Sequence, residues 1–181
     1  MQANHIYDLL PHPGAEIQKI REVIMKIQIR QAVPGDCGTI LRMLEEIAEL
    51  HRKGRPDIFR TGSKKYSEPE FAAIINNPST PVFVAVDNDR VVGYGFCKLI
   101  EYQDHPMIYN FRTLFIDDFF VERTLRGQSV GTMLFHWIQD YAKKKGCKNI
   151  ELNVWEFNEQ AIHFYEKCGM FTQKRRMELT L

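Results

Sequence analysis

Hydrophobic residues recur along this chain with a helical period in some segments and a strand period in others. Behind the turn at 34–36, apolar positions three and four residues apart predict a helix with one buried face, formed by Ile40, Leu41, Leu44, Ile47 and Ala48. A second amphipathic helix is expected to stop at Gly146 and to turn five residues inward: Val130, Leu134, Trp137, Ile138 and Tyr141. A third helix is predicted over 159–167, closed by Gly169.

Runs of β-branched and aromatic residues predict the strands. They lie at 26–30, 82–86, 91–96, 113–121, 148–155 and 175–181, and the turn at 87–90 joins the second and third into a hairpin. Residues 51–69 are rich in charge, Gly and Pro and indicate a long loop, followed by a short helix over 70–76. The pattern predicts a mixed α/β fold with a C-terminal strand-helix-strand crossover.

The 181 residues are enough for one domain, which we place at 25–181 behind an N-terminal extension at 1–24. A net charge of +1 gives no electrostatic reason to bind nucleic acid, and no apolar run is long enough for a membrane. The four cysteines are scattered, and the histidines have no metal-ligand spacing. We therefore expect a cytoplasmic protein with free thiols and no metal site.

A glycine-containing turn at 126–132 connects the strand ending at Val121 to the next helix. The start of a helix offers unpaired N–H groups and the positive end of the dipole, which bind anions. Gly127 and Gly131 permit tight turning and close approach of a ligand, and Arg126 adds a positive charge. These features suit a diphosphate, although from this turn alone a plain strand-helix connection is equally good. The P-loop and dinucleotide-binding patterns are both absent.

Two adjacent carboxylates, Asp117 and Asp118, interrupt the apolar strand at 113–121. Because side chains alternate along a strand, we expect them to face opposite sides. A carboxylate buried in a strand is costly unless it is paired or functional. Each aspartate therefore either pairs near the strand end or belongs to a site.

The segment 158–169 has Asn158 suited to begin a helix and Gly169 suited to end it. It resembles the element Asn-x-x-Ala-x-x-Phe-Tyr-x-x-x-Gly of the GNAT superfamily of N-acetyltransferases, with all five named positions matched. The turn upstream resembles the acetyl-CoA motif of that superfamily, Arg/Gln-x-x-Gly-x-Gly/Ala, through Arg126 and Gly131. Ser129 stands where the motif has its middle glycine, and a left-handed backbone there would cost roughly 1–2 kcal/mol.

The resemblance implies a central, mostly antiparallel sheet with a splayed parallel strand pair, flanked by helices. It implies acetyl-CoA as co-substrate, bound by Phe119, Val121, Arg126, Gly127, Gln128, Ser129, Val130, Gly131, Thr132, Asn158 and Tyr165. The run 116–121 is similar to the strand of polyamine-type members, in which an acid at the position of Asp117 takes the amine proton, with Asp118 as the alternate. Tyr165 would protonate the leaving thiolate, and a backbone N–H near 119–121 would stabilise the thioester oxygen.

The implied reaction is direct transfer of an acetyl group to a primary amine, for which we favour a small-molecule acceptor. A protein N-terminus or lysine is one alternative, and a non-catalytic CoA-binding sensor or scaffold is another. The resemblance also implies a homodimer. The superfamily's acceptor pocket borders the loop behind the first helix, which makes four residues weak candidates for acceptor contacts: Asp57, Phe59, Tyr66 and Tyr102.

Overall fold

The computed structural model of the chain describes residues 26–62 and 64–181, so the predicted extension at 1–24 lies outside the described residues. In chain order the elements are β1 (Ile27–Gln31), η2 (Pro34–Asp36), α2 (Cys37–Gly54), α3 (Glu68–Ile75), β2 (Val82–Asp87), β3 (Arg90–Tyr102), β4 (Phe111–Val121), η3 (Arg123–Leu125), α4 (Val130–Lys144), β5 (Asn149–Leu152) and α5 (Glu159–Lys167). The predicted mixed α/β class is confirmed.

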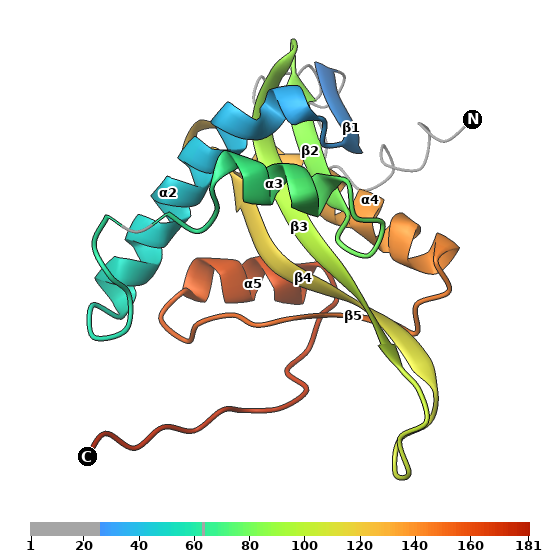
Figure 1. Cartoon of the computed structure of the whole chain (residues 1–181). Helices are drawn as coiled ribbons and strands as arrows, with labels where there is room; N and C mark the ends of the chain where they lie inside the picture. Colours follow the sequence, from blue (N-terminus) through green and yellow to red (C-terminus); the bar gives the residue numbers. More distant parts are fainter. Residues whose placement is uncertain (1–25, 63) are drawn as a thin grey trace, which may run out of the picture.

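The strands form one sheet in the order β1-β2-β3-β4-β5 (Figure 1). The first four are antiparallel to their neighbours, whereas β4 and β5 run parallel. Their pairing begins at Thr113↔Asn149 and ends at Ile116↔Leu152. Beyond Ile116, β4 continues for five more residues without a partner on β5, so the two strands part. This confirms the splayed parallel pair.

Helices cover both faces of the sheet, and each face has its own apolar core. Under α2 and α3, the buried side chains include Ile40, Met43, Leu44, Phe71, Val82, Val84, Tyr94, Phe96 and Phe120. Under α4 and α5, they include Phe83, Cys97, Leu114, Ile116, Leu134, Phe135 and Ile138. Side chains of β2 alternate between the two cores, because Val82 and Val84 face α2 whereas Phe83 faces α4.

A β-bulge in β4 changes which face its side chains reach. The register passes from Phe96↔Asp118 to Cys97↔Ile116, so Asp117 has no partner on β3. Ile116 packs on the α4 face, and Phe120 packs on the α2 face, although regular alternation would put both on one side. The extra residue therefore shifts the phase of the strand between Ile116 and Asp118.

Several predicted boundaries were wrong. The expected loop is shorter at both ends. Residues 51–54 continue α2. At the other end, Ser67 and Glu70 form a capping box, so α3 begins at Glu68. The strand expected at 148–155 covers only Asn149–Leu152, because β4 diverges from it. Trp137 was expected to point inward, but it is 47% exposed, since it lies off the apolar stripe of α4.

The last strand, predicted at 175–181, is absent. This segment is extended and joins no strand of the sheet, so its apolar side chains Met177, Leu179 and Leu181 are exposed. Glu178 of this segment forms an ion pair with Arg55 at the end of α2. Alternating hydrophobicity at 175–181 predicts a strand, but a strand forms only where a neighbouring strand is available to pair with it. Among the described helices, none combines the length and apolar character required to cross a membrane.

Candidate active site

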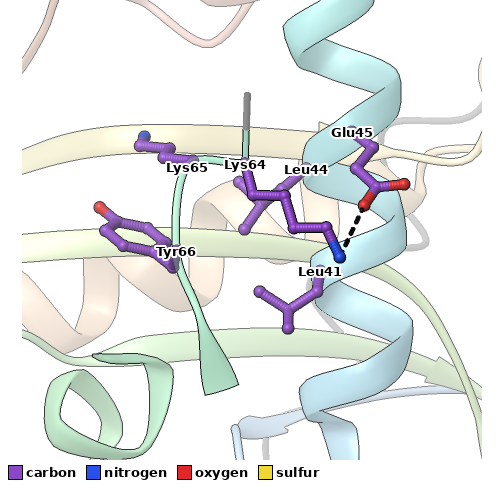
Figure 2. Close-up of a pocket in the computed structure, with 6 residues that line it drawn as sticks. All are labelled: Leu41, Leu44, Glu45, Lys64, Lys65 and Tyr66. Carbon is purple, nitrogen blue, oxygen red and sulfur yellow. Dashed lines mark ion pairs between the residues drawn. The ribbon is translucent and has the colours of Figure 1, made fainter. Parts of the chain in front are cut away.

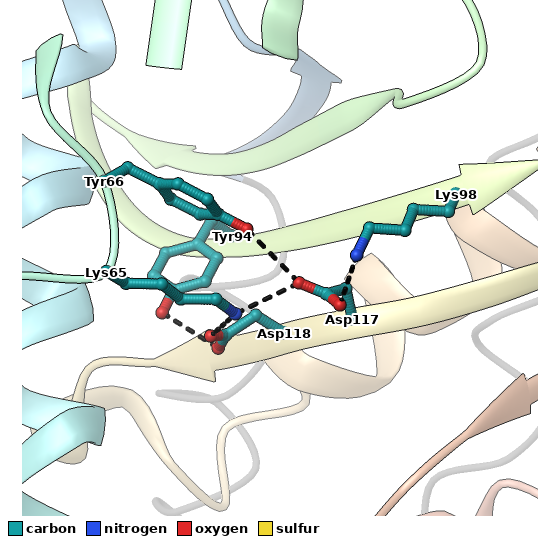
Figure 3. Close-up of polar contacts among 6 residues, drawn as sticks. All are labelled: Lys65, Tyr66, Tyr94, Lys98, Asp117 and Asp118. Carbon is teal, nitrogen blue, oxygen red and sulfur yellow. Dashed lines mark hydrogen bonds and ion pairs between the residues drawn. The ribbon is translucent and has the colours of Figure 1, made fainter. Parts of the chain in front are cut away.

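Four charged side chains meet on the α2 face of the sheet at the bulge in β4 (Figure 3). The Lys65 ammonium donates to Asp118 Oδ2 at 2.8 Å and to Asp117 Oδ2 at 3.1 Å. Lys98 of β3 donates to Asp117 Oδ1 at 2.7 Å. The two aspartates therefore share one ammonium, and the expectation that they face opposite sides was wrong because the bulge turns both toward the α2–α3 connection.

Two tyrosine hydroxyls complete this cluster. Tyr94 donates to Asp118 Oδ1 at 3.1 Å, and Tyr66 donates to Asp117 Oδ2 at 3.4 Å. The Asp118 side chain is 5% exposed and that of Asp117 is 18% exposed, so Asp117 is the more accessible carboxylate. Burying a carboxylate is costly without partners, and here cations and hydroxyls surround both side chains.

The surroundings of Asp117 and Lys65 shift the pKa values of these two groups. Burial opposes ionisation of Asp117, but the hydrogen bond from Lys98 and the charge of Lys65 outweigh it and lower the pKa of this carboxyl below its ordinary value. Burial likewise opposes the charge of Lys65, yet Asp118 and Asp117 raise the pKa of its ammonium. Both ion-pair partners are therefore charged at neutral pH.

Lys65 reaches the aspartates from the connection between α2 and α3. Its neighbour Lys64 points the other way and pairs with Glu45 of α2 at 3.7 Å (Figure 2). The two lysines border a small hollow between this connection and α2, lined by Leu41, Leu44, Glu45, Lys64, Lys65 and Tyr66. Tyr66 stacks on Phe96 of β3 with ring centroids 5.6 Å apart, which holds the connection against the sheet.

The start of α4 has the geometry of an anion site. Gly127 has φ 76°, and Ser129, which precedes the helix, has φ 66° and ψ 0°. The left-handed backbone that the motif glycine would suit is therefore adopted by a serine. Because Val130, Gly131 and Thr132 form the first turn, their N–H groups have no partner within the helix.

Arg126 is held beside this helix start. Its Nε donates to the Val121 carbonyl at 3.1 Å, one guanidinium nitrogen lies 3.3 Å from Gln160 Oε1, and its charge lies over the Phe120 ring. A cation, free N–H groups and open space around Gly127 meet at one place, next to the gap between β4 and β5. These residues fit the diphosphate of coenzyme A.

Tyr165 lies on α5 against the other side of the sheet. Its ring packs near Phe119 of β4 and Phe135 of α4, each with centroids 6.2 Å away, so two neighbouring elements orient it. Burial, reinforced by the charge of Asp118, raises the pKa of Tyr165, so the phenol keeps its proton at neutral pH.

The remaining sequence candidates divide into those near the cluster and those away from it. Asn158 accepts from the Ala161 N–H at 3.3 Å and thereby caps α5.

The weak acceptor candidates lie in different places. Phe59 packs between His51 and Trp155, whereas Asp57 pairs with Arg55. Tyr102 stacks on Phe111 at the far end of the β3–β4 hairpin, and of the four weak candidates only Tyr66 contacts the carboxylates.

Sequence reasoning missed three residues of the cluster: Lys65, Tyr94 and Lys98. Lys98 has a detectable signal, because it is a charged residue within a long apolar strand. Tyr94 was read as an ordinary strand residue, and its hydroxyl acquires a role only through its neighbour on β4. Lys65 is in a charged connection with no periodicity, so nothing in the sequence marks it.

No group of three or more His, Cys, Asp or Glu side chains within residues 26–62 and 64–181 is arranged to hold a metal ion. The five-stranded mixed sheet with its splayed parallel pair and flanking helices is the architecture of GNAT-type acyltransferases. The chain belongs to the acetyltransferase (GNAT) family, whose model matches residues 44–170.

Curated relatives include the thialysine N-epsilon-acetyltransferase of Bos taurus, which is 29% identical over 153 residues covering 79% of this chain and 83% of that protein. N-alpha-acetyltransferase 30 of Schizosaccharomyces pombe is 32% identical over 115 residues, covering 62% of this chain and 72% of its own length. Among solved structures, a tetramutant of the BH1408 protein from Bacillus halodurans superposes with a TM-score of 0.82 and 34% identity, covering 85% of this chain and 99% of that one.

Proposed function

We propose that this enzyme transfers the acetyl group of acetyl-CoA to the primary amine of a small molecule, with Asp117 and Asp118 as the amine site. The observation that supports this most directly is the Lys65 ammonium, which is bound by both carboxylates within 3.1 Å. A site that holds one primary ammonium has the charge and the geometry to hold another. The relative named for acting on thialysine supports a small-molecule acceptor.

Coenzyme A would lie along the gap between β4 and β5, with its diphosphate at the start of α4. The proposed contacts are the residues expected from the sequence: Phe119, Val121, Arg126, Gly127, Gln128, Ser129, Val130, Gly131, Thr132, Asn158 and Tyr165. The thioester supplies an activated acetyl group. The pairing of β4 with β5 ends at Ile116, so the edge of β4 near Phe119 has no strand beside it. A backbone N–H there suits a donor to the thioester carbonyl oxygen.

The acceptor must lose a proton before it can attack, because a lysine-like amine has a pKa near ~10.4. In our proposal Asp117 binds the ammonium and draws off its proton, and Asp118 is the second ligand and the alternate base. The lowered pKa of Asp117 makes it a firm anionic partner at neutral pH but a weak base. Tyr165, whose phenol stays protonated, gives its proton to the departing thiolate.

The test is release of free thiol from acetyl-CoA by the purified chain with a panel of amines, amino acids, aminoglycosides and peptides. We expect release that depends on a small amine, and an Asp117→Asn variant whose kcat/KM falls mainly at neutral pH, where the amine is protonated. Asp57→Asn is the control, because that acid pairs with Arg55 in a loop. No amine-dependent release across the panel would point to a CoA-binding sensor, and release with peptides alone would point to protein substrates.

A homodimer in the cytoplasm remains a prediction from the family resemblance. The exposed apolar side chains of Met177, Leu179 and Leu181 offer surface that a second copy would cover. Light scattering on the purified chain measures its mass in solution, and a monomer at all concentrations would rule the dimer out.

A further inference from the structure

We propose that Lys65 determines which amines this enzyme accepts, because its ammonium holds the position that the acceptor's ammonium must take. An acceptor would then bind only by displacing Lys65 from Asp117 and Asp118. The inference rests on the proposed function, since it uses the same two carboxylates as the acceptor site.

The charge balance of the cluster is the first argument. Two carboxylates, Asp117 and Asp118, face two ammonium groups, Lys65 and Lys98. A balanced cluster offers no net attraction to an incoming ammonium, and it brings that ammonium close to a like charge. When Lys65 leaves, one negative charge remains, and a bound acceptor neutralises it.

The second argument is that the backbone of Lys65 lies outside the sheet, whereas the backbone of Lys98 is fixed within it. Lys98 sits within the β3–β4 ladder opposite Phe115, and its ammonium is bonded to Asp117 alone. Lys65 lies on the α2–α3 connection, outside any helix or strand, and its side chain is 34% exposed. A long, flexible lysine side chain can swing away without moving the sheet.

Lys65 can turn outward into solvent, because its side chain is partly exposed. The hollow next to Lys64 and Glu45 is too small to receive the lysine side chain (Figure 2). A withdrawn Lys65 would add its charge to the entrance of the site. The entrance would then favour amines that carry a negative group at a distance from the reacting nitrogen.

A purely structural ion pair is the ordinary alternative, in which Lys65 only ties the connection to β4. The two explanations predict opposite results for the binding of a simple amine. If Lys65 occupies the acceptor position, its removal strengthens amine binding. If Lys65 only holds the α2–α3 connection against β4, its removal loosens the site, and the affinity for the amine is unchanged or weaker.

The experiment is calorimetry of n-butylamine binding to the full chain at pH 7, without acetyl-CoA, for wild type, Lys65→Met and Lys64→Met. We expect Lys65→Met to bind at least ~5-fold more tightly, because a competent fraction of ~20% or less weakens the apparent affinity of wild type by that factor. Lys64→Met, which removes the neighbouring lysine but leaves the cluster intact, should bind as wild type does. Unchanged or weaker binding by Lys65→Met overturns the proposal.

A measurement on wild type keeps the proposal testable if Lys65→Met does not fold. A brief pulse of N-hydroxysuccinimidyl acetate labels free lysines, and peptide mass spectrometry gives the ratio of label on Lys65 to label on Lys64. We expect this ratio to rise as n-butylamine is added, because displaced Lys65 loses its carboxylate partners. A flat ratio overturns the displacement. Neither measurement needs turnover, so failure of thiol release leaves both readouts intact.

Discussion

At the scale of single residues, Ser129 adopts a backbone conformation that glycine adopts without cost. Its φ of 66° puts it in the left-handed region, where a residue with a Cβ is strained by roughly 1–2 kcal/mol. Replacing it by glycine removes that strain. Glycine also raises the conformational entropy of the unfolded chain, which offsets part of the stabilisation. We expect Ser129→Gly to raise the free energy of unfolding by ~0.5–1 kcal/mol in urea denaturation.

The neighbouring Gly127 provides the matched control. Its φ is 76°, and no atom lies within 4 Å of the position where a Cβ would be. Gly127→Ala should therefore lose ~1 kcal/mol through backbone strain alone. A loss of stability in Ser129→Gly would contradict the left-handed conformation at that position.

His51 makes the stability of the protein depend on pH. Burial is the main reason that its pKa is lowered, and the attraction of Asp118 offsets only part of that effect. An unfolded histidine titrates near ~6.5, so below this pH the unfolded state binds more protons than the folded state. Stability should be fully present above pH ~6.5 and should fall as the pH drops toward the folded pKa.

The measurement is the free energy of unfolding between pH 7 and pH 5 for wild type and His51→Phe. Phenylalanine keeps the ring contact with Phe59 but has no proton to bind, so its slope should be shallower. His163→Gln changes an exposed histidine and retains His51, so it should keep the wild-type slope. Equal slopes in wild type and His51→Phe would refute the assignment.

Tyr165 is the residue on which the proposed acid step depends. Its raised pKa keeps the phenol protonated, and its ring is oriented by Phe119 and Phe135. We expect Tyr165→Phe to lower kcat by at least ~10-fold, at the lower edge of general-acid effects, while preserving the ring packing. Tyr102→Phe, at the far end of the β3–β4 hairpin, should leave the rate of thiol release unchanged. An unchanged kcat for Tyr165→Phe would remove it from the mechanism.

At the scale of elements, the contact between β3 and β4 depends on a glycine. A Cβ on Gly93 would lie 2.8 Å from the Phe120 carbonyl oxygen, a backbone atom that cannot turn aside. Gly93→Ala must therefore separate the strands next to the site, and we expect it to lower the free energy of unfolding by ~1–3 kcal/mol.

Gly38 is the control for this prediction, because it lies in α2 with no atom within 4 Å of its Cβ position. Alanine favours a helix over glycine by up to ~1 kcal/mol, so Gly38→Ala should be neutral or stabilising. Thermal unfolding of the two variants side by side separates the steric effect from the general effect of replacing glycine. Equal behaviour of the two would contradict the close approach of β3 to β4.

At the scale of the whole molecule, coenzyme A should stabilise the folded protein if α4 begins at its binding site. A ligand that binds only the folded state, at a concentration of 100 times its Kd, adds ~2.7 kcal/mol to the free energy of unfolding. We expect thermal denaturation to show a rising midpoint with coenzyme A. Pantetheine lacks the diphosphate and should raise the midpoint far less.

Arg126→Ala tests the same prediction from the side of the protein. The guanidinium is fixed beside the helix start by Val121 and Gln160, so its removal should reduce the stabilisation by coenzyme A. Lys143→Ala removes a cation from the opposite end of α4 and should retain the full stabilisation. A coenzyme A effect that Arg126→Ala leaves intact would place the diphosphate elsewhere.

The sequence by itself determined the elements that depend on local chemistry. The apolar stripe of α2, the hairpin of β2 and β3 and the glycine that ends α4 were all predictable, because helix periodicity, strand alternation and turn residues act over a few positions. The two motifs, with Arg126 and Tyr165, identified the family for the same reason. Residues that bind a common ligand keep a recognisable spacing.

Tertiary structure alone decided how the chemistry is assembled. One extra residue in β4 turned Asp117 and Asp118 to the same side, and this bulge depends on the register against β3. Lys65 joined them from a connection 52 positions away from Asp117, through a contact that no local pattern encodes. The extended segment at 175–181 was not a strand, because pairing requires a neighbour that alternation in sequence cannot supply.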